Sequence, residues 1–75
     1  MQRYKDAAGD SGVTAYAIDE HAITLRFKQG GTYRYDYGRP GRLKVEKMKA
    51  LARRGKGLAT YVNQHVRDHY AEKLS

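Results

Sequence analysis

The fold of this 75-residue chain is decided by residues 23–37, which read ITLRFKQGGTYRYDY. Apolar and polar side chains alternate on both sides of the Gln-Gly-Gly sequence, and this is the period of a half-buried strand. Paired glycines between two such runs favour a tight turn. The segment therefore predicts a β-hairpin whose two strands contribute side chains to one core.

The length of the turn decides where the tyrosines of the second strand point. A three-residue turn, 29–31, pairs Phe27 with Tyr33 and adds the tyrosines to the apolar face of the first strand. A two-residue turn places them beside Arg26 and Lys28 instead, as a basic aromatic platform for stacked bases. It also brings polar side chains onto the core face, which is energetically costly. We favour the core arrangement, because so short a chain has few large apolar groups to spare.

Further strand and helix signals flank the hairpin. Residues 13–18 are rich in β-formers and predict a strand, whereas residues 1–12 have no periodicity and predict a flexible lead-in. Residues 42–54 predict a helix with inward-facing apolar positions, and Gly55 suits the position just after its last turn. Residues 58–70 predict a second helix, because apolar, aromatic and histidine side chains recur there with helical spacing.

Together these elements predict an α+β fold, a three-stranded antiparallel β-meander packed on one face by two C-terminal helices. We expect a single domain over residues 13–75. The chain has no cysteine, so neither disulfides nor thiolate zinc sites support the core. It also has no apolar run near the roughly 20 residues of a membrane span, and no signal-peptide core at its N-terminus. We therefore expect a cytoplasmic protein that does not enter a membrane.

Positive charge is concentrated in residues 39–56, which read RPGRLKVEKMKALARRGK. This segment holds eight bases and one acid, Glu46, so it accounts for the whole formal net charge of +7. Such a concentration predicts a polyanionic partner. The alternative is a solvated helix face that only keeps the protein soluble, but the bases have few acids with which to form i, i+4 pairs. Helical spacing predicts outward-facing bases at Arg42, Lys47, Lys49, Arg53 and Arg54.

Two histidines in the second predicted helix raise the question of metal binding or catalysis. His65 and His69 stand four residues apart, which suits a shared metal ion, but no third ligand accompanies them. We interpret both as neutral core histidines that are hydrogen-bonded to a tyrosine hydroxyl or a backbone group. A small nuclease could use histidine, lysine and tyrosine, but no spacing marks a nucleophile, a base and an orienting group. We expect no metal, no cofactor and no catalytic residue.

The chain resembles the KTSC domain over residues 11–70. The resemblance is carried by SGVTAYAID at 11–19, LRFKQGG at 25–31, the tyrosines Tyr33 and Tyr35, and YVNQHVR at 61–67. This short module occurs at the C-terminus of some lysyl-tRNA synthetases and as a stand-alone bacterial protein, and RNA binding has been suggested for it. The resemblance implies a non-enzymatic, RNA-associated module without a defined active site. The basic helix departs from the family pattern and leaves DNA open as the ligand.

We predict a small, basic, non-enzymatic protein that binds RNA or DNA mainly through backbone phosphates. The alternative function is a protein-interaction module that docks an acidic partner, for example in translation. The predicted contact residues are the bases of the first helix and its flanks, the bases on the open face of the hairpin, and two polar residues of the last helix that face away from its apolar side. They are Arg26, Lys28, Arg34, Arg39, Arg42, Lys47, Lys49, Arg53, Arg54, Lys56, Asn63 and Arg67.

Overall fold

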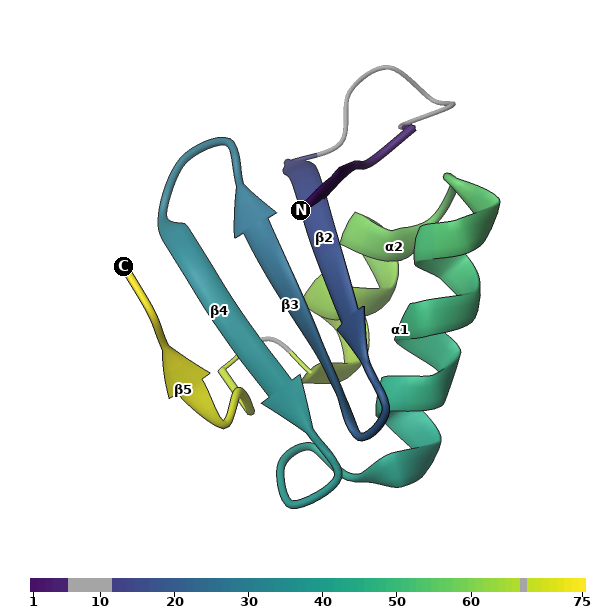
Figure 1. Ribbon diagram of the computed structural model, residues 1–75, viewed down its shortest axis with the longest axis vertical. Coiled ribbons are helices and arrows are strands. Elements are labelled where there is room, and N and C mark those ends of the chain that lie inside the picture. Colours follow the sequence, from purple (N-terminus) through teal and green to yellow (C-terminus); the bar gives the residue numbers. More distant parts are fainter. Residues whose placement is uncertain (6–11, 67) are drawn as a thin grey trace.

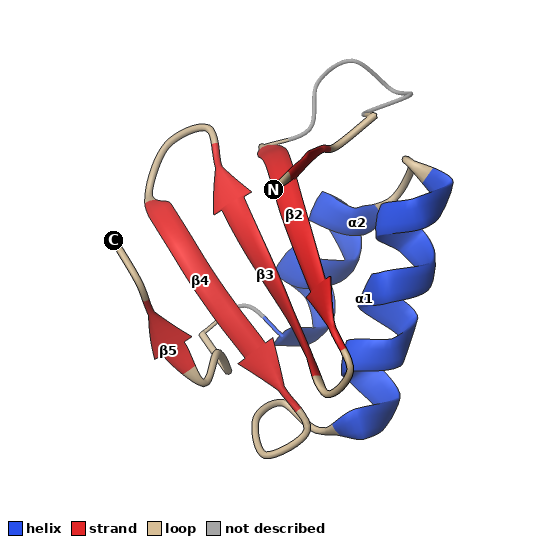
Figure 2. Ribbon diagram, in the orientation of Figure 1, coloured by secondary structure: helices blue, strands red, loops and turns tan. Residues whose placement is uncertain are grey.

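The computed structural model describes residues 1–5, 12–66 and 68–75. Its strands are β1 (Gln2–Arg3), β2 (Val13–Asp19), β3 (Ala22–Phe27), β4 (Gly31–Asp36) and β5 (Glu72–Lys73). Its helical segments are α1 (Arg42–Arg54), α2 (Leu58–Tyr61) and the π-helical turn η1 (Val62–Val66). The strands form one antiparallel sheet in the order β1-β2-β3-β4-β5, and the helices cover one of its faces (Figures 1 and 2). None of the helices in this described part of the chain is long and apolar enough to span a bilayer.

The predicted three-stranded meander is wrong, although the α+β class agrees with the structure. The hairpin strands and β2 form the centre of the sheet, but a two-residue strand is added at each edge. Two residues are too few to show an alternating pattern, so neither outer strand could be predicted from periodicity. The sheet therefore has five strands, and its two outer strands come from opposite ends of the described chain.

The central hairpin confirms that the tyrosines face the core. Leu25 pairs with Tyr33 and Ile23 with Tyr35, and Tyr35 is only 1% exposed. The turn begins one residue earlier than predicted, so Phe27 pairs with Gly31 and not with Tyr33. This shifts the predicted register by two residues, and a shift by two leaves every side chain on the same face. The basic aromatic platform is excluded by the same register.

Helix α1 has the predicted bounds and the predicted buried face. Val45 and Met48 are fully buried against the sheet, and Leu51 and Ala52 are nearly so. Gly55 ends the helix in a left-handed conformation, φ 77°, and its N–H bonds to the carbonyl oxygens of Leu51 and Ala52. Glycine adopts this conformation without the steric cost that a Cβ imposes, which explains why the helix stops here.

The N-terminal residues, expected to belong to a flexible lead-in, instead reach into the core. β1 pairs with β2 through Gln2 and Arg3. Tyr4 is 3% exposed, and its hydroxyl accepts a hydrogen bond of 3.2 Å from the N–H of Leu58 at the start of α2. The ring therefore supplies core volume and the hydroxyl satisfies a buried backbone donor. The rest of the expected lead-in, residues 6–11, lies outside the described residues.

The second predicted helix is shorter than expected, and its histidines are not in the core. α2 has four residues and passes into η1, after which the chain turns towards β5. Val62 and Val66 are buried, whereas His65 and His69 are both exposed. A π-helical turn holds more residues than an α-helical turn, so the i, i+4, i+7 projection fails after residue 61. The prediction of two core histidines is therefore wrong.

Candidate nucleic-acid interface

Seven exposed bases gather at one end of the molecule, which we call the basic end. They are Arg3, Lys5, Arg26, Lys28, Arg53, Arg54 and Lys56. They come from three parts of the chain that lie at the same end of the molecule, with the turn after β3 on the left and the end of α1 on the right at the top of Figure 1. These parts are residues 2–5, the end of β3 with the following turn, and the C-terminal end of α1. Lys5 and Arg3 were not predicted, because residues 1–12 were expected to be a flexible lead-in.

Three contacts hold these parts of the basic end together. Arg3 and Arg26 both pair with Ala15, from opposite sides, so their side chains project from the same face of the sheet. The N–H of Lys28 bonds to the carbonyl oxygen of Gly12 at 2.6 Å, which fixes the turn beside the start of β2. Lys5, two residues after β1, packs directly on Gly55, where the absence of a side chain lets the chain approach the end of α1.

The Lys5–Gly55 contact is close enough to exclude any larger residue at Gly55. A Cβ built on Gly55 would lie 2.6 Å from the Cβ of Lys5. Glycine is therefore required at position 55 for two reasons. It adopts the left-handed backbone conformation, and its lack of a side chain leaves room for the chain that carries Lys5. The same contact places Lys5 beside Arg54 and Lys56, which flank Gly55 in sequence.

The acidic side chains of the described residues lie away from the basic end. Six of the eight acids fall in the described residues, and Asp6 and Asp10 do not. Asp19, Glu20 and Asp36 sit at the opposite end of the sheet, where β2 and β4 finish (Figure 1). The three others are Glu46 in the first half of α1, Asp68 after η1, and Glu72 opposite Arg34. Among the described residues, the seven bases of the basic end are therefore separated from the acids. The positive electrostatic potential concentrates at that end.

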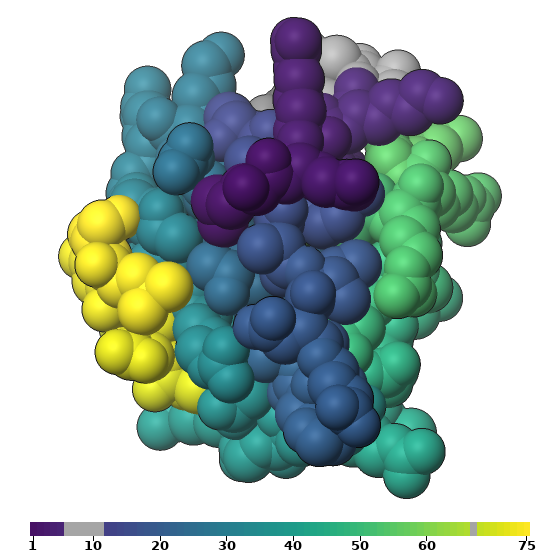
Figure 3. All heavy atoms as spheres, viewed as in Figure 1, coloured from purple at the N-terminus to yellow at the C-terminus, as the bar shows by residue number. Residues whose placement is uncertain are grey.

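The sheet face opposite the helices takes part in this separation. In the space-filling view it fills the front of the molecule, and α1 is visible only along one side (Figure 3). Arg26 is exposed on this face near the basic end. Arg34, on the next strand, is not a free cation. Its guanidinium lies 3.3 Å from the carboxylate of Asp19 and 3.9 Å from that of Asp36. Paired in this way, Arg34 has less positive charge to offer a phosphate.

Lys49 is the predicted contact residue that the structure places least favourably. It is 4% exposed, and its ammonium donates hydrogen bonds of 2.8 Å to the carbonyl oxygen of Glu20 and to the carboxylate of Glu46. The ammonium also lies 5.6 Å from the ring centre of Tyr37, within the range of a cation–π contact. The predicted outward position of Lys49 is wrong, because the turn between β2 and β3 covers that side of α1.

The same cluster shifts two ionisation equilibria. Hydrogen bonds from Lys49 and from Tyr37 lower the pKa of the Glu46 carboxyl, because both donors favour the charged carboxylate. The bond to Glu46, 2.6 Å long, raises the pKa of the Tyr37 hydroxyl, because ionising the phenol would remove the donated proton. The cluster is thus a fixed ionic contact between α1 and the sheet.

The remaining predicted residues are separated from the basic end. Arg39 and Arg42 are exposed at the other end of α1, where the Asp36 carboxylate accepts hydrogen bonds from the N–H groups of Gly38 and Arg39. Lys47 is exposed in the middle of α1, and Asn63 is exposed on η1. Arg67 lies outside the described residues. Of the predicted set, the residues that lie at the basic end are Arg26, Lys28, Arg53, Arg54 and Lys56.

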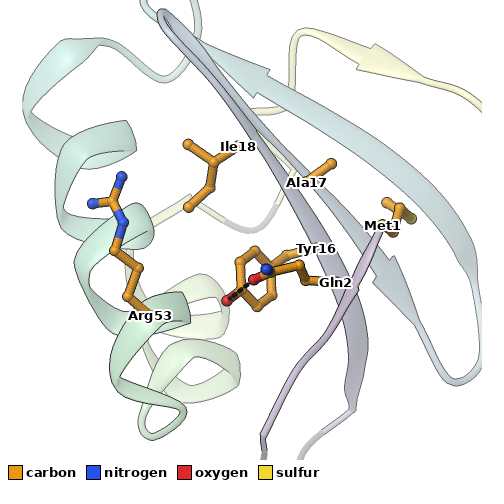
Figure 4. Close-up of a pocket in the computed structure, with 6 residues that line it drawn as sticks. All are labelled: Met1, Gln2, Tyr16, Ala17, Ile18 and Arg53. Carbon is orange, nitrogen blue, oxygen red and sulfur yellow. Dashed lines mark hydrogen bonds between the residues drawn. The ribbon is translucent and has the colours of Figure 1, made fainter.

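A shallow hollow of about 550 Å³ lies between the edge of β2 and α1 (Figure 4). It is lined by Met1, Gln2, Tyr16, Ala17, Ile18 and Arg53. The hydroxyl of Tyr16 donates a hydrogen bond of 2.8 Å to the side-chain oxygen of Gln2. Arg53 has the one charged side chain of the lining, and the lining contains neither an acid nor a histidine.

The histidines do not assemble a reactive cluster with one another. His21 lies in the turn between β2 and β3, edge-on to the ring of Tyr37 at 4.9 Å, while His65 lies on η1 and His69 after it. Within residues 1–5, 12–66 and 68–75, no three histidine or acidic side chains are close enough to hold a metal ion.

Comparison of the chain with protein-family models, with curated proteins and with solved structures finds no match in any of the three.

Proposed function

We propose that this protein binds nucleic acid, RNA or DNA, by contacting backbone phosphates at the basic end. The observation that supports the proposal is the basic end itself. Seven exposed bases from three separate parts of the chain lie at this end, and none of the acids in the described residues lies among them. Phosphate contacts need positive charge and hydrogen-bond donors at the surface, and they carry no sequence information. The resemblance to the KTSC family stays a prediction and points to the same class of ligand.

The position of these bases favours a partner that is itself extended and charged. They lie at the end of a sheet, in a turn and at the end of a helix, so they are spread over several elements. A small anion would contact only one or two of them. Arg53 and Arg54 also stand in the last turn of α1, where their charge offsets the negative end of the helix dipole. The electrostatic potential at the surface of this end of α1 therefore stays positive.

Fluorescence anisotropy with labelled single-stranded and duplex RNA and DNA at several salt concentrations tests the proposal. Each neutralised phosphate lowers log K by about 0.7 to 0.9 per log unit of salt. The double substitution Arg54→Gln and Lys56→Gln is therefore expected to weaken binding and to reduce that slope by about 1.5. The control is Arg39→Gln with Arg42→Gln, which removes the same charge at the far end and should change the slope much less. Equal effects of the two pairs, or no binding even in low salt, would overturn the proposal.

The alternative, docking of an acidic protein, draws on the same charge. The two proposals differ in the molecule that occupies the basic end, which is a nucleic acid in one and an acidic protein in the other. Nucleic-acid binding predicts that partners captured from an extract disappear after nuclease treatment. Capture that resists nuclease but is lost with the Arg54 and Lys56 substitutions would favour an acidic protein as the partner.

A further inference from the structure

One pair of aromatic rings lies at the surface of the helical layer, away from the core tyrosines of the hairpin. Tyr61 ends α2 and His65 lies on η1, four residues further on. Their ring centres are 4.6 Å apart, and the ring planes are inclined by 33°. His65 is exposed and Tyr61 is half-buried, so the pair is anchored at one ring and open at the other.

The surroundings of this pair are polar and basic. Asn63 and Gln64 are exposed on the same π-helical turn, and the ammonium of Lys44 lies 3.5 Å from the carbonyl oxygen of His65. Along α1, Lys47 and Arg54 follow Lys44 at i+3 and i+10, so the three bases share one flank of the helix. This flank continues from the ring pair to the basic end, which begins at Arg54.

We propose that Tyr61 and His65 form a stacking site for an unpaired nucleobase, so that the preferred ligand is single-stranded nucleic acid. This inference rests on the proposed function. A base can stack on an exposed ring whatever its identity, because every base has a π-face. The bases of a duplex are already stacked on one another, and their faces are not available to a side chain. A strand that leaves the basic end along Lys47 and Lys44 brings its bases over His65.

The geometry of η1 explains how the pair is presented. Val62 and Val66 of this turn are buried, and they anchor it to the core. The residues between them, 63–65, are exposed. A π-helical turn is rare in proteins and is found frequently at functional sites. Here it holds a ring, two side-chain amides and a neighbouring ammonium on one small surface.

The test compares strands of equal length and charge that differ only in their bases. An oligonucleotide with bases and a matching abasic strand are titrated against the wild type and three variants. His65→Ala removes the exposed ring, and Tyr61→Leu keeps apolar packing while removing the aromatic face. His69→Ala is the matched control, because His69 is also exposed and has no ring contact within the described residues.

The wild type is expected to bind the strand with bases about fivefold or more tightly than the abasic strand. His65→Ala and Tyr61→Leu should abolish most of that preference without changing the salt slope, and His69→Ala should keep it. On binding, the ring protons of His65 and Tyr61 should shift upfield in NMR spectra of the wild type. Equal affinity for the two strands, without such shifts, overturns the stacking site and leaves the phosphate proposal in place. No binding of either strand, even in low salt, overturns both.

Discussion

The ammonium of Lys49 lies 2.8 Å from the main-chain carbonyl oxygen of Glu20 and fastens the middle of α1 to the turn between β2 and β3. Lys49→Met removes this bond and the bond to Glu46, and it leaves a carbonyl oxygen without a partner. We expect the free energy of unfolding to fall by about 1 to 3 kcal/mol in urea titrations. Lys47→Met, two positions away and exposed, should stay within about 0.5 kcal/mol of the wild type. Lys49→Met should also bind nucleic acid like the wild type, and a large loss of affinity would show that its role is not structural alone.

Tyr4 connects the N-terminal strand to the start of α2 through a single hydroxyl. Tyr4→Phe keeps the ring in the core but leaves the N–H of Leu58 without its acceptor. We expect a loss of about 1 to 2 kcal/mol in unfolding free energy, because that donor is buried. Tyr16→Phe is the control, since its hydroxyl bonds to a glutamine side chain that can turn to water instead. Equal losses in the two variants would contradict a special role for Tyr4.

Gly55 and Gly57 have almost the same backbone conformation, with φ of 77° and 82°. They differ in what a side chain would meet. The nearest atom to a Cβ on Gly57 is a Leu51 methyl carbon at 3.8 Å, an ordinary contact, whereas Lys5 lies much closer to Gly55. We expect Gly57→Ala to cost about 1 kcal/mol from backbone strain alone, and Gly55→Ala to cost clearly more. Adding Lys5→Gly should recover the excess in Gly55→Ala and nothing in Gly57→Ala, as a double-mutant cycle of unfolding free energies would measure.

Tyr35 makes the fold sensitive to alkali. Burial, and then the charges of Tyr33, Tyr70 and Asp68, raise the pKa of its hydroxyl to about 12. The unfolded chain loses this proton near pH 10, so above that pH the unfolded state binds fewer protons and stability falls as pH rises. The contribution is about 2 kcal/mol between pH 10 and 12. Tyr35→Phe should flatten the decline in unfolding free energy across this window, and an unchanged slope would assign the alkaline loss to other groups.

Arg26 and Arg34 lie on adjacent strands of the same sheet face but differ in their partners. Arg34 is bonded to Asp19, whereas Arg26 stands beside Ala15 and Thr32 in the strand register. We expect Arg26→Gln to weaken nucleic-acid binding several-fold at low salt and Arg34→Gln to weaken it less, because Arg34 is paired with two acids whereas Arg26 has no acidic partner within the described residues. Anisotropy titrations at one fixed low salt concentration compare the two. The reverse order would contradict the assignment of the basic end.

Patterns that repeat over several turns or strand residues were predictable from the sequence. The faces of the hairpin and the inward side of α1 follow from such repeats, and even a two-residue register shift left Tyr35 in the core. β1 and β5 were not predictable, because a two-residue strand has no period. Lys49 shows a different limit. Its position on α1 was predictable, but its burial was not. Its ammonium bonds to the backbone carbonyl oxygen of Glu20, and a pattern of side chains does not show where a backbone oxygen lies.

The candidate site was predicted in part, for the same reasons. Arg53, Arg54 and Lys56 follow from the charge of one segment, whereas Arg3 and Lys5 join them only through tertiary contacts with β2 and Gly55. Helical spacing assigned His65 to the core, because the sequence gives no sign of the π-helical turn that exposes it. A local change in the number of residues per turn thus moved one ring from the predicted interior to the surface.

The two outer strands also set how the protein can associate with itself. β1 and β5 are two residues long, while the strands that they cover, β2 and β4, have seven and six. Fraying of either short strand bares the backbone donors and acceptors of a longer one, and such an edge is a template for pairing with another copy. This opening does not require the core to unfold. Aggregation of this small domain should therefore begin from a nearly native state, at a rate that depends on fraying at the sheet edges more than on global stability.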